Sequence, residues 1–286
     1  MIEVVTLDRG RNTLIKPIEL TGKGVHSGLE VTARILSAPA GTGYRFHRTD
    51  LASKPAIEAT TENLVTDKLL RRTTLRQGGA VVYTIEHILS ALRGCDIDDA
   101  VIEMNAEEAP FLDGSSKPFV EAILKAGTDQ HSQPAQAIRV IQPFCYSDPE
   151  AEISAAPDTK LRISYYFNSE HPLLRRQHFN LIVDADSYQK EIAPARTFCF
   201  FDEIETMRKN GLIKGANLGS AVVVGTKSII NDKLRFDDEM TRHKILDFIG
   251  DLSLLGMPLQ GHFMSWKSGH RVNAGLAAHI KKEMTH

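Results

Sequence analysis

The stretch TIEHILSALRGCDIDDAVIEMNAEEAPFLDGSSKPFVEAILKAG, residues 84–127, follows the order helix, strand, turn, helix. Apolar residues recur at helical spacing over 85–92 and stop before Gly94, and a β-like run follows over 99–104. A turn then leads to a second helical stripe that ends at Gly127. This order of elements predicts an α+β unit.

The second half of the chain ends in the same order. A long helix is predicted over 238–255, where Gly256 stops it. A strand over 259–266 and a last helix from about Ser268 follow. The repeated ending predicts an α+β fold of two similar domains, each a β-sheet with helices.

Shorter signals complete the expected organisation. The polar stretch 128–134 ends in proline near the middle of the chain, so we expect a linker there, with a boundary near Gln130. The predicted domains are therefore 1–130 and 131–286. Further β-like runs cover 30–36, 55–59, 72–76, 137–142, 161–167 and 179–183.

Composition limits the classes of function. The 286 residues are 42% hydrophobic, which is typical of a globular protein with a sizeable core. The net charge of −2 gives no overall attraction for nucleic acid, so no nucleic-acid partner is expected. Three widely spaced cysteines argue against a disulfide framework or a thiolate zinc site. We find no signal peptide or membrane-spanning apolar run, and we expect a cytoplasmic protein.

The strongest chemical signal is RHKILDFIGD, residues 242–251. His243 and Asp247 lie four residues apart on a predicted helix and Asp251 lies four further on, so all three share one face. A solvated face with a stabilising His/Asp pair explains this pattern too, because an i, i+4 pair alone is a weak metal signal.

A second signal is YTIEH, residues 83–87. Thr84 is a predicted N-cap, which places Glu86 and His87 in the first helical turn, where the helix dipole favours an ionised carboxylate. Adjacent Glu and His suit a site in which the imidazole binds a metal and the carboxylate handles the proton of a metal-bound water. A capping acid beside a surface histidine is the alternative interpretation.

Taken together, these signals suggest a metal centre. His87, His243 and Asp247 make a two-histidine, one-carboxylate set with an open fourth position, the ligand type of catalytic zinc, and Glu86 is an uncoordinated base. The same three ligands suit non-haem Fe(II), so the identity of the metal stays open at this point.

Three further segments carry weaker signals. His270 opens the last helix, and a general-acid role there needs a carboxylate to hold its proton, for which Asp251 is available. The glycine-rich stretch TGKGVHSG, residues 21–28, includes His26 but lacks the spacing of known phosphate loops, so a hairpin is the first interpretation. The apolar segment 192–224 is either a core helix with its loop or an apolar lid or tunnel.

Seven short motifs occur in order along nearly the whole chain. They are Thr21–Gly28 (TGKGVHSG), Thr84–Leu92 (TIEHILSAL), Phe111–Ser115 (FLDGS), Ala195–Phe198 (ARTF), Leu234–Glu239 (LRFDDE), Arg242–Leu252 (RHKILDFIGDL) and Ser268–His270 (SGH). As an ordered set they resemble the zinc-dependent UDP-3-O-acyl-N-acetylglucosamine deacetylases of lipid A biosynthesis. Each motif is weak alone, but the ordered set is highly specific.

The resemblance implies a zinc-dependent hydrolase that removes acetyl from UDP-3-O-acyl-N-acetylglucosamine, giving acetate and the free amine in an early committed step of lipid A biosynthesis. It also implies two domains that sandwich their helices between two sheets. We expect the protein to be a monomer. The implied roles are zinc ligation by His87, His243 and Asp247, general base for Glu86, general acid for His270 with Asp251 behind it, oxyanion donor for Thr197, and a sugar–phosphate contact for Lys244. The implied substrate contacts are Phe198, Phe167, His26, Ile204, Leu212 and Ile213, the last three in an inserted acyl-binding segment near 192–224.

Two other functions stay open from sequence. One is a non-haem Fe(II) oxygenase built on the same ligands, which requires iron-dependent O₂ uptake and gives no role to Glu86. The other is a non-catalytic nucleotide-sugar or lipid-binding protein with a decayed site. Against the latter, every catalytic position of the family holds its expected residue type.

Overall fold

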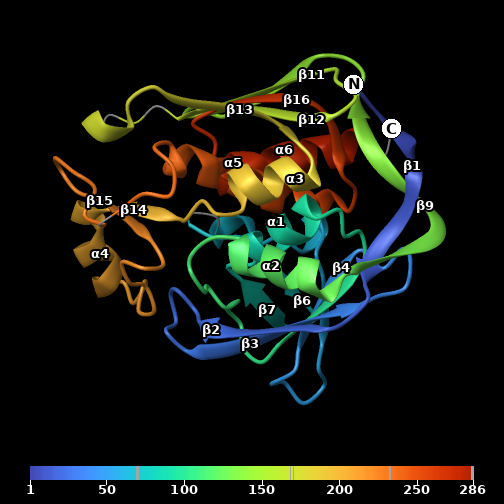
Figure 1. Ribbon diagram of the computed structural model, residues 1–286, viewed down its shortest axis with the longest axis horizontal. Helices are drawn as coiled ribbons and strands as arrows, with labels where there is room; N and C mark the ends of the chain where they lie inside the picture. The colour runs from blue at the N-terminus through green and yellow to red at the C-terminus, as the bar shows by residue number, and fades with distance from the viewer. Residues whose placement is uncertain (69–70, 168, 170, 232, 285–286) are drawn as a thin grey trace.

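The computed structural model describes residues 1–68, 71–167, 169, 171–231 and 233–284. Its main helices form a central layer between two β-sheets, one above and one below in Figure 1. The predicted α+β fold, with helices sandwiched between two sheets, is confirmed. Within the described ranges, every helix is too short or too polar to span a bilayer.

The strands and helices have the following bounds. The strands of the first half are β1 (Ile2–Leu14), β2 (Ile18–Lys23), β3 (Glu30–Ser37), β4 (Tyr44–Arg48), β5 (Ala56–Glu58), β6 (Thr74–Gln77), β7 (Ala80–Tyr83) and β8 (Ala100–Met104). Those of the second half are β9 (Thr128–Val140), β10 (Phe144–Ser147), β11 (Glu152–Ala156), β12 (Leu161–Phe167), β13 (Gln177–Val183), β14 (Phe198–Phe200), β15 (Val222–Val224) and β16 (Leu259–Trp266). The α-helices are α1 (Glu86–Gly94), α2 (Lys117–Ala126), α3 (Ala185–Ser187), α4 (Ile204–Lys209), α5 (Glu239–Leu252) and α6 (His270–Glu283).

The two sheets repeat one topology. The lower sheet has the order β2-β3-β8-β4-β5, and the upper sheet contains the equivalent order β10-β11-β16-β12-β13. In both sheets, the second strand of a hairpin pairs antiparallel with the central strand, β8 or β16. The central strand pairs parallel with its other neighbour, β4 or β12, and this neighbour pairs antiparallel with the edge strand, β5 or β13. One helix precedes each central strand and another follows it. This is the duplication that the repeated sequence endings predict.

Burial follows the layer order. In β8, Ala100, Ile102 and Met104 are buried and alternate with half-buried residues, which is the two-residue period of a sheet with one covered face. Helix α5 is buried on nearly every side because it lies between both sheets. Polar side chains on such a helix need partners, since an unpaired buried polar group is costly.

The predicted linker is wrong, because residues 128–134 form the first part of β9. This strand pairs antiparallel with β1 from one end to the other, and the register shifts around Gly10, which lies opposite Pro134. Together β1 and β9 form a two-stranded ribbon, the β1–β9 ribbon, which runs down the right side of Figure 1. Most side chains of residues 128–134 are exposed. Backbone pairing with β1 overrides the polar composition of the segment. The division of the chain at 130 stays a prediction.

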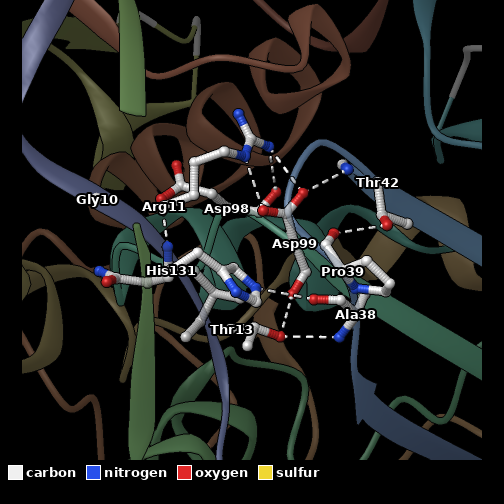
Figure 2. Close-up of polar contacts among 12 residues, drawn as sticks. Gly10, Arg11, Thr13, Ala38, Pro39, Thr42, Asp98, Asp99 and His131 are labelled. Atoms are coloured by element: carbon white, nitrogen blue, oxygen red, sulfur yellow. Dashed lines mark hydrogen bonds and ion pairs between the residues drawn. The ribbon is translucent and has the colours of Figure 1, made fainter. Parts of the chain in front are cut away.

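A buried polar cluster joins this ribbon to the lower sheet (Figure 2). The guanidinium of Arg11 donates two hydrogen bonds, of 2.7 and 2.8 Å, to the fully buried carboxylate of Asp99. The Thr13 hydroxyl donates to the Asp99 carbonyl and accepts from the N–H of Ala38. On β9, the His131 ring donates to the Ala38 carbonyl over 3.1 Å. Four segments are thereby held together.

The inserted segment stands apart from both sheets, at the left of Figure 1. Strands β14 and β15 pair parallel as a separate two-stranded sheet, and the short helix α4 lies between them in sequence. Val222 and Val224 pack in a small apolar cluster of their own rather than in the main core. The interpretation of this segment as a core helix is therefore wrong.

Helices α1 and α5 approach each other closely at Gly250. A Cβ atom there would lie 2.3 Å from the carbonyl oxygen of Glu86, a distance that real Cβ contacts do not reach. Only glycine permits this approach. It brings the start of α1, with Glu86, against the last turn of α5, which begins just after Asp247.

Gly250→Ala is expected to lower the free energy of unfolding by about 1–3 kcal/mol, because α1 must move away from α5. The displaced backbone belongs to Glu86, so kcat is expected to fall as well. Urea unfolding and steady-state kinetics measure the two effects. Wild-type values of both would contradict the close approach of the two helices.

Candidate active site

Three side chains that are distant in sequence meet in the helix layer. His87 on α1 and His243 and Asp247 on α5 each offer a ligand atom, and these atoms all lie within 4.8 Å of one another. All three residues are buried. The two imidazole rings meet edge to face with their centroids 5.1 Å apart. The structure thus brings together the residues predicted to bind a metal.

The protonation states of these residues suit a divalent cation. Burial lowers the pKa of His87 to about 3 and also lowers that of His243, so both rings are neutral at pH 7. Burial opposes ionisation of Asp247, but His243 and Lys244 hold the pKa of its carboxyl below the usual range. Neutral imidazoles and an ionised carboxylate are the forms that bind a metal ion.

The orientation of His243 is fixed from outside the cluster. Its Nδ1 lies 3.0 Å from the carbonyl oxygen of Ala195. A carbonyl only accepts, so Nδ1 carries the hydrogen and the Nε2 lone pair is free for a metal. Metal-ligating histidines commonly make such an outer contact. The residues present therefore fit a bound metal ion.

Glu86 lies next to the predicted metal ligand His87, at the first position of α1. Its side chain is buried, and its Oε2 accepts a hydrogen bond of 3.1 Å from the backbone N–H of Thr73. Burial raises the pKa of the Glu86 carboxyl to about 7. A carboxylate with a pKa near neutrality can take up and release a proton under physiological conditions.

The prediction that Thr84 caps α1 is wrong. The N-cap residue is Ile85, and no side chain caps this helix. Thr84 has a φ of +56°, unlike the extended backbone of a capping threonine. Its hydroxyl instead donates to the carboxylate of Glu108 over 3.2 Å.

His270, at the start of α6, is held by Asp251 of α5. Its Nδ1 lies 2.8 Å from Asp251 Oδ2, and both residues are buried. Burial alone lowers the pKa of His270, but the carboxylates of Asp251, Asp247 and Glu86 raise it to about 9. The ring is therefore protonated at neutral pH, as a general acid requires.

Thr73, which no sequence pattern singled out, connects Glu86 with Asp251, the partner of His270. Its backbone N–H binds Glu86, and its hydroxyl donates to Asp251 Oδ1. Asn273 donates to the other oxygen of Asp251 over 2.9 Å. No sequence signal marks a threonine before a short hairpin as a partner of two carboxylates.

Most of the predicted site residues line one cavity of about 460 Å³. Asp251 does not line it and lies behind His270, as expected for a residue that holds the acid in place. The other predicted residues that line the cavity are Glu86, His87, Thr197, His243, Lys244, Asp247, His270, Phe198, Phe167, His26, Ile204 and Ile213.

The inserted segment supplies the apolar part of the cavity wall. Phe200, Met207 and Val223, which the sequence analysis did not single out as contacts, line the cavity beside Ile204 and Ile213. A lid or tunnel is therefore the better interpretation of this segment. Leu212 is not among the lining residues. Its backbone N–H donates to the carbonyl at position 207, where it closes the C-terminal end of α4.

Lys244 and Thr197 reach the cavity from different elements. The ammonium of Lys244 lies 3.1 Å from Asp247 Oδ2 and 5.6 Å from the centroid of the Phe198 ring. The backbone of Thr197 is fixed at both ends, because its N–H donates to the Gly114 carbonyl and its own carbonyl accepts from β15. Thr197 is therefore held in place at the cavity that the predicted metal ligands also line.

The glycine-rich turn is a hairpin, as predicted, because β2 and β3 pair antiparallel on either side of it. The carboxylate of Glu108 accepts hydrogen bonds from the backbone N–H groups of His26 (2.8 Å) and Ser27 (2.7 Å). Glu108 is buried and was missed by the sequence analysis. Its two bonds hold His26 at the cavity, where burial lowers the pKa of the imidazole.

The fold and the site fit the class of metal-dependent enzymes, because three buried side chains that could bind a metal ion line one cavity together with Glu86 and His270. A family model described as LpxC, UDP-3-O-acyl N-acetylglycosamine deacetylase, matches residues 11–282. The chain belongs to this family of deacetylases.

Individual relatives agree with the family match. The chain is 42% identical over 264 residues to a UDP-3-O-acyl-N-acetylglucosamine deacetylase of Geotalea uraniireducens, covering 92% of this chain and 85% of the relative. Proteins of the same name from Syntrophus aciditrophicus (40% identity, 93% and 84% coverage) and Myxococcus xanthus (39% identity, 96% and 87% coverage) are also similar. The resemblance inferred from the seven motifs is confirmed.

Proposed function

We propose that the protein hydrolyses the acetamide of UDP-3-O-acyl-N-acetylglucosamine, giving acetate and the free amine in an early step of lipid A biosynthesis. One observation carries the proposal. The predicted metal ligands, the base Glu86 and the acid His270 line the same cavity, and apolar side chains of the inserted segment extend its wall. Family membership supports the same reaction.

We propose zinc as the resident metal, held by His87, His243 and Asp247. A bound zinc ion supplies Lewis-acid polarisation of the acetyl carbonyl and makes water acidic enough to react at neutral pH. Neutral imidazoles and an ionised carboxylate within 4.8 Å of one another support this assignment.

The chain's own groups then move protons and stabilise charge. Glu86 accepts a proton from the water as the water oxygen attacks the acetyl carbon. The carbonyl oxygen becomes an oxyanion, to which the hydroxyl of Thr197 donates, and loss of one such donor commonly costs about 3 kcal/mol. His270, held protonated by Asp251, gives its proton to the amine nitrogen as the C–N bond breaks. The products are acetate and the free amine.

The cavity also has candidate contacts for the acyl chain and for the sugar and phosphate groups of the substrate. Phe198, Ile204 and Ile213 line the apolar part of the cavity and suit an acyl chain. Lys244 and His26 are the proposed contacts for the sugar and phosphate groups. Because one chain lines the whole cavity, we propose that the protein acts as a monomer.

Acetate release from UDP-3-O-acyl-N-acetylglucosamine of several acyl lengths tests the proposal. We expect release by zinc-loaded protein and none after chelation, with activity restored by added zinc. The same samples, loaded with Fe(II) and followed for O₂ uptake, test the oxygenase alternative. Metal-dependent O₂ uptake without acetate release would overturn the deacetylase assignment, and substrate binding without either reaction would indicate a binding protein.

The pH dependence of kcat/KM tests the acid. We expect activity to fall as the pH rises through about 9, because His270 must carry its proton to donate it. Asp251 and Asp247 face the ring from α5, and Glu86 faces it from α1. Asp251→Asn removes the closest carboxylate, so this loss should shift to lower pH. An unshifted alkaline limb in the variant would contradict the proposed pairing.

A further inference from the structure

The motif LRFDDE, residues 234–239, has no part in the reaction described above. Its last residue, Glu239, opens α5 and is fully buried. Oε1 accepts from the backbone N–H (3.0 Å) and Nε (2.8 Å) of Arg196. Oε2 accepts from Arg196 Nη2 (3.1 Å) and from the backbone N–H of Arg235 (2.7 Å). A buried charge is tolerated when it is paired in this way.

Arg196 lies between two residues of the active site. The carbonyl of Ala195, on one side, accepts the hydrogen bond from His243 Nδ1. Thr197, on the other side, lines the cavity. Glu239 binds both the backbone and the guanidinium of Arg196, so this short segment is fixed relative to α5. His243 lies one turn further along the same helix, which makes the carbonyl and the imidazole parts of one rigid unit.

Arg235 holds the same segment from a second direction. Its guanidinium donates to the carbonyl of Pro194 over 2.8 Å and pairs with Asp113 at 2.9 Å. Asp113 belongs to the turn before α2, and the Ser116 hydroxyl at the end of that turn donates to the backbone carbonyl of His87. Residues from both halves of the protein therefore hold segment 194–197, which leads into β14 and contacts His243.

We propose that Glu239 is a positioning residue for the metal centre. By fixing Arg196 it holds the Ala195 carbonyl against His243 and so sets the orientation and tautomer of that imidazole. It also holds Thr197 at the cavity, and this second part rests on the proposed deacetylation, whereas the first part requires only metal binding. Outer contacts of metal-ligating histidines are typically worth about 10–100-fold in metal affinity or activity.

Glu239→Gln tests the proposal, because the amide cannot accept all four hydrogen bonds and leaves the Arg196 guanidinium without its counter-charge. Zinc affinity is measured by competition with a chromophoric chelator, and ligand geometry by the visible absorption spectrum of the cobalt-substituted protein. We expect zinc binding to weaken about 10–100-fold and the cobalt spectrum to change.

Asp99→Asn is the matched control for a loss of stability alone. Asp99 is also fully buried, forms a two-bonded pair with Arg11 (Figure 2) and accepts from the backbone N–H of Gly43 (2.8 Å). None of these three residues lines the active-site cavity. The control is expected to be less stable to urea with unchanged zinc affinity and cobalt spectrum. Glu239→Gln with wild-type affinity and spectrum would overturn the proposal, as would equal weakening in both variants.

Arg196→Lys covers the case in which Glu239→Gln fails to fold. Lysine keeps the charge and the backbone N–H but loses the planar two-bonded contact with Glu239. We expect a folded protein with weaker zinc binding and an altered cobalt spectrum, and wild-type values would again overturn the proposal. Neither readout uses the substrate. If the wild-type protein releases no acetate while the variants bind zinc more weakly than the wild type, the deacetylation is rejected and the positioning role is retained.

Discussion

Glu86→Gln is expected to lower kcat by about 10²–10⁴-fold while one zinc ion stays bound. The amide keeps the shape of the side chain and can still accept from the Thr73 N–H, but it cannot take a proton from water. Glu86 lies next to the ligand His87 without belonging to the ligand cluster, so the metal should remain in place. Steady-state kinetics and metal analysis of the purified variant measure both quantities.

The matched control for this variant is Glu103→Gln. Glu103 lies on the outer face of the lower sheet, where it pairs with Arg34, and it does not line the cavity. We expect wild-type kcat and metal content from the control. A Glu86→Gln protein with near wild-type kcat would remove Glu86 from the role of base.

His243→Ala is expected to abolish stoichiometric zinc binding and, with it, acetate release. The substitution removes one of three ligands and also frees the Ala195 carbonyl from its partner. The loss of affinity should exceed the roughly 10–100-fold that follows removal of an outer contact, because a ligand itself is lost. Metal analysis after dialysis and the acetate assay measure the result.

His262→Ala serves as the control for histidine removal. His262 lies on β16, and its ring bonds to Ser164 of the neighbouring strand rather than to any residue of the metal cluster. We expect this variant to keep one zinc ion and full activity. An active His243→Ala protein that contains no zinc would contradict the assignment of the metal site.

Much of the fold could be predicted from local sequence patterns. The strand over 161–167 and the strand over 259–266 are found as predicted, and the helices begin and end close to their glycine and polar signals. These patterns report the burial of one face, which is a local property. The β1–β9 ribbon could not be predicted in this way, because residues 128–134 are polar and become a strand only through pairing with a distant partner.

The residues of the candidate site also fall into two groups: those that a local sequence pattern predicts and those that depend on contacts with distant residues. The spacing of four residues marked His243 and Asp247, because it places both side chains on one face of a helix. Glu86 was marked by its position next to His87 at the start of another helix. The supporting residues Thr73 and Glu108 carry no local signal, since each acts through contacts with residues distant in sequence. The resemblance to a family supplied roles that spacing alone left open, including that of Thr197.

The geometry of the inserted segment was the least predictable part. Its apolar content indicated either a core helix or a tunnel, and only the pairing of β14 with β15 outside the main sheets separates the two. Leu212 shows the limit of composition, because an apolar residue in the right segment turns its backbone to the end of α4 and does not line the cavity.

Titration of the metal-free protein with zinc, followed by acetate release, tests the central claim most directly. Three ligands at one centre predict that the rate rises in proportion to added zinc and stops rising at one equivalent. Full acetate release by protein that contains no metal would contradict the account, as would release that still rises well beyond one equivalent.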